Sequence, residues 1–247
     1  MKVRADQLLV SRGLAPTRAK AQALVLAGKV YVGEARVEKA GAMLQDDAPV
    51  VVRGEDHAFV SRGGVKLAGA LDTFAVDPTG KRCLDLGAST GGFTDCLLQR
   101  GATSVAAVDV GYGQLAHKLR VDPRVLVLER TNARTLEPET IGGQADLVVV
   151  DASFIGLGKL LPAIARCMRE GGELVALVKP QFEVGREEAS RGRGVVRDPE
   201  VRARAIAGVL EEITAAGLEV IATCDSTIEG PKGNREAFVH AKRLPAG

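Results

Sequence analysis

Residues that could carry chemistry follow two strand-like segments of the sequence. Cys83–Leu86 runs directly into a loop that reads G-A-S-T-G-G-F-T, and the next strand-like segment ends at Asp109. Glycines at a strand-to-helix turn let a ligand approach the backbone at the carboxyl edge of a sheet. A carboxylate at the end of the neighbouring strand can accept hydrogen bonds from both hydroxyls of a ribose. These features predict a site for a ligand that contains a nucleoside.

The spacing of the glycines narrows the ligand class. The loop lacks the G-x-G-x-x-G spacing of dinucleotide sites and the G-K-[ST] ending of a phosphate loop, so NAD and ATP are disfavoured. The segments D-L-G-A-S-T-G-G-F-T and V-A-A-V-D-V together resemble the first two motifs of class I S-adenosylmethionine methyltransferases. The resemblance implies that Asp85 faces the methionine end and Asn132 the adenine edge of this cofactor. A turn that binds a different nucleotide remains the alternative. The predicted cofactor contacts are Asp85, Gly87, Ala88, Ser89, Gly91, Gly92, Phe93, Asp109 and Asn132.

Four charged residues lie in further distinctive contexts. Asp151 in V-V-V-D-A-S-F and Lys179 in V-K-P-Q-F-E each follow a strand-like run, which predicts that both lie at the ligand-binding edge of a parallel sheet. Lys66 lies in S-R-G-G-V-K-L and Glu236 in G-N-R-E-A-F. The order Lys, Asp, Lys, Glu resembles the catalytic tetrad of FtsJ-like ribose 2′-O-methyltransferases, over residues 61 to 243. The alternative for any one of these residues is a surface salt bridge.

The resemblance implies a division of labour among these four residues. A ribose hydroxyl is a weak nucleophile, so an enzyme that methylates it must orient the oxygen and help to remove its proton. We expect Lys179 to contact the hydroxyl and to deprotonate or steer it. Asp151 and Glu236 are expected to orient Lys179, and Lys66 to add a fourth, cationic contact.

The first forty residues are basic. They hold eight Lys or Arg against three acids, an excess of +5, although the whole chain has a net charge of only +2. The segment R-x-D-x-L-L, followed by T-R-A-K-A-Q-x-L-V-L-A-G-K-V-Y-V-G, resembles the S4-type RNA-binding domain. By position, this resemblance implies that Arg4, Arg18, Lys20 and Lys29 contact RNA phosphates. An ordinary solvated helix face is the alternative.

The periodicity predicts the elements that hold these residues. Helices are expected at Ala5–Ser11, from Thr17 as N-cap to about Ala27, and at Gly63–Phe74. Apolar runs predict strands, with helical stretches between most of them, and this alternation favours a doubly wound α/β sheet. The predicted strands are Arg82–Leu86, Ser104–Val108, Val125–Leu128, Leu147–Val150, Leu174–Val178, Leu218–Cys224 and Ala237–Ala241, the last as an antiparallel partner of the sixth.

The expected organisation is a small α+β S4-type domain at residues 1 to 55, a linker at 56 to 62, and a Rossmann-like class I methyltransferase domain at 63 to 247. The combination resembles the TlyA family, which is also named for haemolysin. Membership implies S-adenosylmethionine-dependent 2′-O-methylation of a cytidine ribose in ribosomal RNA, with ribosomal RNA or ribosomal subunits as partner. A non-catalytic RNA-binding protein and a membrane-active protein are the alternatives.

Further features bear on these alternatives. No apolar run reaches the roughly 18 residues that a membrane-spanning helix needs, so we expect no membrane partner and a cytoplasmic protein. The four cysteines lack C-x-x-C spacing, so neither a metal site nor a disulfide is expected. The linker reads His57-Ala58-Phe59-Val60 where the family often carries Arg-x-Trp-Val. The segment from Gly185 to Gly194, with three arginines, is a candidate loop that closes over RNA, and an ordinary solvent-exposed loop is the alternative.

Overall fold

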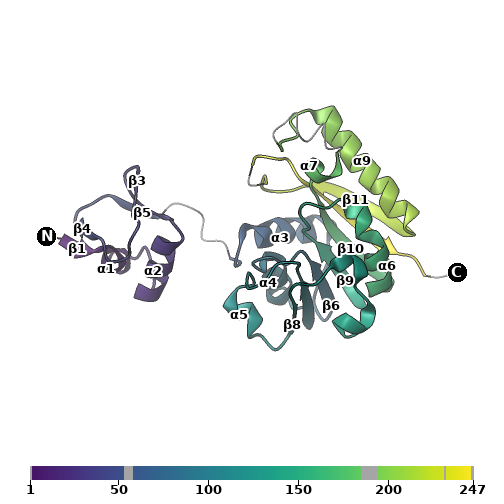
Figure 1. Cartoon of the computed structure of the whole chain (residues 1–247), viewed down its shortest axis with the longest axis horizontal. Coiled ribbons are helices and arrows are strands. Elements are labelled where there is room, and N and C mark those ends of the chain that lie inside the picture. Colours follow the sequence, from purple (N-terminus) through teal and green to yellow (C-terminus); the bar gives the residue numbers. More distant parts are fainter. Residues whose placement is uncertain (1, 53–57, 185–193, 231, 246–247) are drawn as a thin grey trace. The chain divides into compact units, whose positions relative to one another are not determined.

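The structure, a computed structural model, describes residues 2–52, 58–184, 194–230 and 232–245. The chain forms two compact units, Met1–Asp56 and His57–Gly247 (Figure 1). Each unit has a hydrophobic core of its own. The candidate loop from Gly185 to Gly194 lies outside the described residues except for Gly194.

The first unit packs two helices against short strands. Its elements are β1 (Lys2–Arg4), α1 (Ala5–Ser11), α2 (Arg18–Leu26), β2 (Val30–Val32), β3 (Ala35–Arg36), β4 (Met43–Gln45) and β5 (Val50–Val52). Strand β1 pairs with β4, while β2 lies between β3 and β5. The Thr17 side chain accepts a hydrogen bond from the backbone of Lys20 and so caps α2, as predicted. Gly28 adopts φ +69° just beyond the helix, where a residue with a Cβ would be strained.

The second unit is built on a seven-stranded sheet. Its strands are β6 (Arg82–Leu86), β7 (Ser104–Val108), β8 (Val125–Leu128), β9 (Ala145–Val150), β10 (Met168–Val178), β11 (Leu218–Asp225) and β12 (Ala237–Arg243). Its helices are α3 (Arg62–Phe74), α4 (Gly92–Gln99), α5 (His117–Arg120), α6 (Leu161–Cys167), α7 (Pro180–Glu183) and α9 (Pro199–Ala215). The spatial order of the strands is β11-β12-β10-β9-β6-β7-β8, and β12 alone runs antiparallel to its neighbours.

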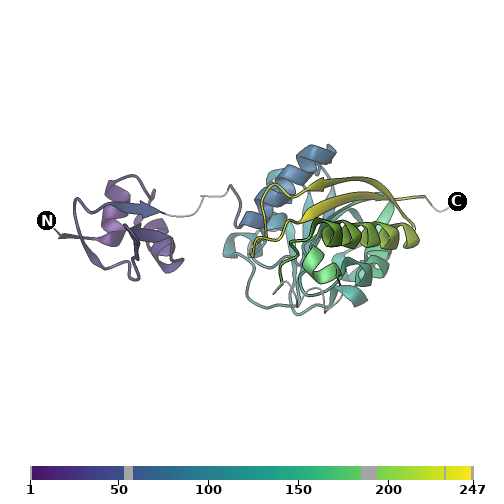
Figure 2. The same ribbon diagram turned by 90° about the horizontal axis from the view of Figure 1, so that it is seen from above.

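The sheet is covered on both faces, which explains its long apolar strands. Alternate strand residues face two separate cores. Leu84 and Val148 pack with Ile164 of α6 and Ile213 of α9 in one core. The other core, on the opposite face, is formed with α3 and α4. Figure 2 shows α3 in blue and α9 in green on opposite sides of the strands. The predicted doubly wound α/β fold is confirmed.

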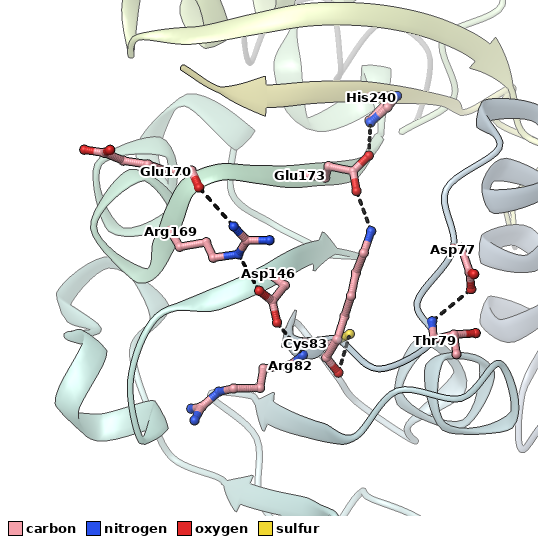
Figure 3. Close-up of polar contacts among 10 residues, drawn as sticks. Asp77, Thr79, Arg82, Cys83, Asp146, Arg169, Glu170, Glu173 and His240 are labelled. Carbon is pink, nitrogen blue, oxygen red and sulfur yellow. Dashed lines mark hydrogen bonds and ion pairs between the residues drawn. The ribbon is translucent and has the colours of Figure 1, made fainter. Parts of the chain in front are cut away.

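Polar contacts tie the strands together at the edge where the parallel strands begin. The Asp146 carboxylate accepts hydrogen bonds from the Arg82 backbone at 2.8 Å and from the Arg169 side chain. Glu173 contacts His240 at 3.1 Å and also pairs with Lys81 (Figure 3). Because these contacts lie at the start of the strands, the loops that follow the opposite, carboxyl ends remain available for a site.

The position of the last strand in the sheet was only partly predicted. The antiparallel pairing of β12 with β11 was predicted, and it is present. The sequence did not indicate that β12 also inserts between β10 and β11, with Val178 opposite Ala237. This insertion places Glu236, the residue just before β12, next to the carboxyl end of β10.

Candidate active site

A cavity of about 760 Å³ lies at the carboxyl edge of the parallel strands. The loop after β6, the loop after β9, the start of α3 and the segment before β12 all contribute to its wall. All four members of the predicted tetrad line this one cavity; they are Lys66, Asp151, Lys179 and Glu236. The surface-salt-bridge alternative therefore does not describe them, because Lys66, Lys179 and Glu236 are buried and Asp151 is half-buried.

The first ion pair of the cavity joins α3 to β12. Lys66 Nζ lies 2.5 Å from Glu236 Oε2, and the two side chains are only 9% and 1% exposed. Glu236 also fits closely against the turn before it, since a Cβ built on Gly230 would lie 2.6 Å from Glu236 Oε1. Both side chains are almost completely removed from solvent, so each charge is neutralised by the other and not by water.

The second ion pair joins the ends of β9 and β10. Lys179 Nζ lies 2.6 Å from Asp151 Oδ1 and 2.7 Å from Ser153 Oγ, with a longer contact of 3.4 Å to the Asp151 carbonyl oxygen. The contacts to Ser153 Oγ and to the Asp151 carbonyl are hydrogen bonds, and the contact to Asp151 Oδ1 is an ion pair. The longest contact is the weakest, so it is the one that a ligand oxygen can replace at least cost.

Two glycines of the loop after β6 pack so closely against their neighbours that a side chain would not fit. Gly87 has φ +87°, and a Cβ there would lie 2.8 Å from the carbonyl oxygen of Asp151. Gly91 has φ +92°, and its Cβ would lie 2.2 Å from a methyl carbon of Leu119. Only glycine satisfies both the conformation and the space at these positions. Gly87, Ala88, Ser89, Gly92 and Phe93 line the cavity as a backbone cradle.

Asp85 lies beneath this cradle rather than in the cavity wall. Its carboxylate is completely buried and accepts one hydrogen bond, from Thr94 Oγ1 at 2.6 Å. Within the described residues its other oxygen, Oδ1, has no partner. Desolvation is the main reason why the pKa of Asp85 is raised to about 7, and the hydrogen bond from Thr94 opposes it.

Replacing Asp85 by asparagine is expected to change how stability depends on pH. Between about pH 4 and 7 the folded protein keeps a proton on Asp85 that the unfolded chain releases, so the free energy of unfolding falls as pH rises through this window. The Asp85→Asn variant lacks this loss. At pH 8 its free energy of unfolding should therefore exceed that of the wild type by up to about 4 kcal/mol. This difference should shrink toward pH 4.

Urea unfolding of the methyltransferase unit at several pH values measures this difference. The measurement is made without cofactor, because a cationic ligand would favour the ionised carboxylate. Parallel stability curves for the two proteins between pH 4 and 7 would contradict the buried, proton-binding state of Asp85.

Four of the predicted cofactor residues lie outside the cavity wall: Asp85 and Gly91, described above, and also Asp109 and Asn132. Asp109 accepts hydrogen bonds from the backbone of Ser89 at 2.8 Å and of Gly111 at 2.6 Å, so its carboxylate holds the cofactor loop against the loop after β7. Asn132 is exposed, and its side chain accepts a hydrogen bond from the Arg134 backbone at 3.1 Å. Contact of either residue with a nucleoside stays a prediction.

Several residues of the cavity wall were not predicted. Ser153 and Phe154 lie two and three residues after Asp151, and Phe182 lies three residues after Lys179. They belong to the same two motifs, so their closeness in sequence to Asp151 and Lys179 was the signal that could have identified them. Asn234 is 2% exposed and binds the segment after the undescribed loop, donating to the Gly194 carbonyl at 2.8 Å and accepting from the Val196 backbone at 2.9 Å. The remaining unpredicted wall residues are Ser61, Arg62, Gly63, Thr90, Gln181, Glu229 and Lys232.

The four basic residues predicted to bind RNA lie in the first unit. Arg4 ends β1, Arg18 begins α2, Lys20 follows on the same helix, and Lys29 precedes β2. The structure brings Arg4 and Arg18 together, because both contact the carboxylate of Asp6 at 3.0 Å.

The described part of the chain shows neither a metal site nor a membrane-spanning helix. No group of three or more His, Cys, Asp or Glu residues is arranged to hold a metal ion there. None of the helices described is both long enough and apolar enough to cross a membrane.

Known families match nearly the whole chain. The FtsJ-like methyltransferase model matches residues 59–243, and the S4 domain model matches residues 3–50. The chain is 52% identical over 239 residues to the 16S/23S rRNA (cytidine-2′-O)-methyltransferase TlyA of Mycobacterium tuberculosis, covering 96% of this chain and 89% of that protein. It is 38% identical to Hemolysin A of Brachyspira hyodysenteriae, over 96% of this chain and 99% of that protein.

A solved structure agrees with these sequence matches. A hemolysin-named protein from Streptococcus thermophilus is 40% identical, with a TM-score of 0.77 over 99% of this chain and 90% of that chain. The chain therefore belongs to the FtsJ-like methyltransferases, in the TlyA family that joins an S4 domain to the methyltransferase domain.

Proposed function

We propose that this protein transfers a methyl group from S-adenosylmethionine to the ribose 2′-hydroxyl of a cytidine in ribosomal RNA. One observation carries the proposal. Two lysine–carboxylate pairs face a single cavity beside a glycine cradle. The names of the relatives support the choice of acceptor, since TlyA of Mycobacterium tuberculosis is a cytidine-2′-O-methyltransferase of 16S and 23S rRNA.

The residues at the cradle suit S-adenosylmethionine. A Cβ at Gly87 or Gly92 would clash with Asp151 or Ser61, so glycine is needed for the loop to pack there. Both glycines line the cavity, where their backbone can contact a ligand. Among the residues that the structure describes, one oxygen of the buried Asp85 carboxylate has no partner, and a cationic group nearby would lower the cost of its charge. When bound, the cofactor supplies a methyl group that its sulfonium has already activated. No catalytic metal is required by this chemistry.

Lys179 is the proposed contact to the 2′-hydroxyl. Its ammonium can exchange the 3.4 Å contact to the Asp151 carbonyl for the hydroxyl oxygen while it keeps its bonds to Asp151 Oδ1 and Ser153 Oγ. These two retained bonds fix Nζ, and a fixed Nζ orients the acceptor oxygen. As the oxygen gains the methyl group its proton becomes acidic, and the Asp151 carboxylate is the nearest base to receive it, through Lys179 Nζ.

The other pair lines the same cavity. Lys66 Nζ is held by Glu236 Oε2, and both side chains are almost completely buried. Charged groups held rigidly in a site with little water act more strongly than in bulk solvent, because no solvent reorganisation is needed. We assign Lys66 and Glu236 to orienting the ribose and to setting the field around Lys179.

Phe154 is the proposed support for the target base. This side chain lines the cavity and is 92% exposed, with φ +66° and its ring 5.3 Å from that of Phe182. An aromatic ring exposed to water and a left-handed backbone at a residue with a Cβ are both unfavourable for folding. We therefore infer that this ring serves binding and not the stability of the fold. Bases that leave an RNA strand commonly stack on such rings.

Replacing Phe154 by alanine is expected to reduce kcat/KM for RNA by about 10- to 100-fold, as the loss of one base-stacking contact predicts. The cofactor Kd should stay within about twofold, because Phe154 is not among the predicted cofactor contacts. Phe154→Tyr keeps the ring and is the matched control. Steady-state methylation and equilibrium cofactor binding provide the two readouts, and an unchanged kcat/KM in the alanine variant would exclude base stacking at this position.

Methyl transfer itself is tested with labelled S-adenosylmethionine. Purified protein is incubated with ribosomal RNA and with separated ribosomal subunits that lack the modification, and the 2′-O-methylated nucleotides are then mapped. The expected result is label on a cytidine ribose. Label on a base nitrogen or carbon, or no label on any ribosomal substrate, would overturn the proposed function.

A further inference from the structure

A carboxylate is buried in the basic S4 unit. Asp6, in the first turn of α1, has a side chain with no exposed surface. It accepts four hydrogen bonds of 3.0 Å each, from Nε and Nη2 of Arg4, Nε of Arg18 and Nε2 of Gln22. These donors hold the pKa of Asp6 well below its usual range, with the Arg4 bonds as the largest cause. The carboxylate is therefore ionised at any physiological pH.

The arginines on this carboxylate face solvent as well. The side chain of Arg4 is 40% exposed and that of Arg18 is 53% exposed. They come from different elements, since Arg4 ends β1 and Arg18 begins α2. Both donate to the same oxygen, Asp6 Oδ2, so the carboxylate brings the two guanidinium groups to one place. The described bond from Arg18 uses Nε, which leaves its terminal nitrogens for a partner outside the fold.

We propose that Asp6 is a positioning residue for RNA binding, which fixes Arg4 and Arg18 as one paired phosphate-binding group without touching RNA itself. The proposal rests on the proposed function, because it takes RNA as the partner of the S4 unit. Guanidinium groups recognise phosphate oxygens by geometry as well as charge. A pair that is already ordered before binding loses less side-chain freedom when the phosphate arrives.

Two physical effects would change the Kd for RNA in opposite directions when Asp6 is replaced, so the direction of the change tests the proposal. One negative and two positive charges give the cluster a net charge of +1, so removal of the Asp6 charge raises it to +2. If charge alone mattered, Asp6→Asn would bind RNA more tightly. If positioning dominates, the same variant binds more weakly, because both arginines regain rotational freedom. Coulombic gains at an exposed site are screened at physiological salt, so we expect positioning to win.

The first experiment measures binding of the full-length protein to fluorescently labelled ribosomal RNA over a range of salt concentrations. We expect Asp6→Asn to raise Kd by about fivefold to tenfold, in line with the loss of ordered charge-assisted bonds. The slope of log Kd against log salt should stay near that of the wild type, because both arginines keep their charges. Arg4→Ala with Arg18→Ala should instead reduce the slope by about 1.4, the value for two lost contacts to single-stranded RNA.

A double-mutant comparison separates positioning from a purely structural role. If Asp6 acts through the arginines, Asp6→Asn changes Kd in the wild-type background and adds nothing in the background that lacks both arginine side chains. A structural role would weaken binding in both backgrounds. In methylation assays the effect should appear in KM for RNA, with kcat and the cofactor Kd unchanged.

A second set of variants covers the case in which Asp6→Asn fails to fold. Arg4→Lys with Arg18→Lys keeps every charge and keeps Asp6 paired, but a lysine cannot make the same forked contact. This variant should also raise Kd by about fivefold, whereas Arg36→Lys, a conservative change at an exposed β3 arginine, should change it less than twofold. Urea unfolding of the S4 unit shows which variants are folded.

Each possible result of these experiments either supports or overturns the proposal. Weaker binding by Asp6→Asn that is confined to the background with both arginines supports the proposal. If Asp6→Asn does not fold, weaker binding by the double lysine variant takes its place. Tighter or unchanged binding, or equal weakening in both backgrounds, overturns it while the proposed function stands. If the wild type itself does not bind ribosomal RNA, the proposed function fails and this inference fails with it.

Discussion

Replacing Lys179 by alanine is expected to reduce the rate of methyl transfer by about 10²- to 10⁴-fold, the usual contribution of a positioned acid–base group. Lys179 Nζ is the cavity atom best placed to hold an acceptor oxygen, because Asp151 and Ser153 fix it at 2.6 and 2.7 Å. Alanine removes the donor and leaves nothing else on β10 that reaches the same point. The loss should therefore appear in kcat under saturating RNA and cofactor.

The same substitution should leave the fold and the cofactor site nearly unchanged. Asp151 is 26% exposed, so water can solvate its carboxylate once the lysine is gone, and the stability loss should stay near 1 kcal/mol. Lys179→Arg is the matched control: it keeps the charge, but the larger planar guanidinium does not reproduce a compact ammonium with three donors. Single-turnover methylation, cofactor titration and urea unfolding provide the three measurements. Near-normal turnover in a folded alanine variant would remove Lys179 from the mechanism.

The sequence predicted most of the sheet because its strands are buried on both faces. The apolar run Ser104–Val108, buried from Val105 to Val108, has the bounds that the structure shows. The edge strand Val125–Leu128 also has the predicted bounds, although it is only partly buried. The insertion of β12 beside β10 could not be predicted in this way. Strand order depends on pairing between distant segments, and Ala237–Ala241 is apolar enough to pair with more than one neighbour.

The site was predictable where residue type alone restricts the backbone or the charge. Gly87 could be inferred because a turn with φ +87° accepts little else, and the cavity now contains all four tetrad residues. The partner of each tetrad residue could not be inferred. Among the described residues, Lys179 forms an ion pair with Asp151 and Glu236 forms one with Lys66, whereas both acids were expected to orient Lys179. Ion pairing depends on side-chain distances of a few ångströms, which no spacing in the chain encodes.

The pair of Lys66 and Glu236 should show the largest effect on stability. Its side chains are 9% and 1% exposed, so neither charge can be solvated alone. Lys66→Met leaves the Glu236 carboxylate buried without its cation, and we expect a loss of about 3–5 kcal/mol in the free energy of unfolding. Glu236→Gln should cost less, because the amide oxygen still accepts a hydrogen bond from Lys66.

The double variant Lys66→Met/Glu236→Gln separates the structural role of this pair from its catalytic one. Without either charge the buried site no longer carries an uncompensated ion, so most of the stability lost in Lys66→Met should return. Methyl transfer should not return, because the field and the ribose contact that we assign to the pair are both gone. Urea unfolding of the methyltransferase unit and turnover on ribosomal substrates measure the two quantities in the same preparations. A double variant that regained both would show that the pair only maintains the fold, and one that regained neither would show that the two charges are not each other's compensation.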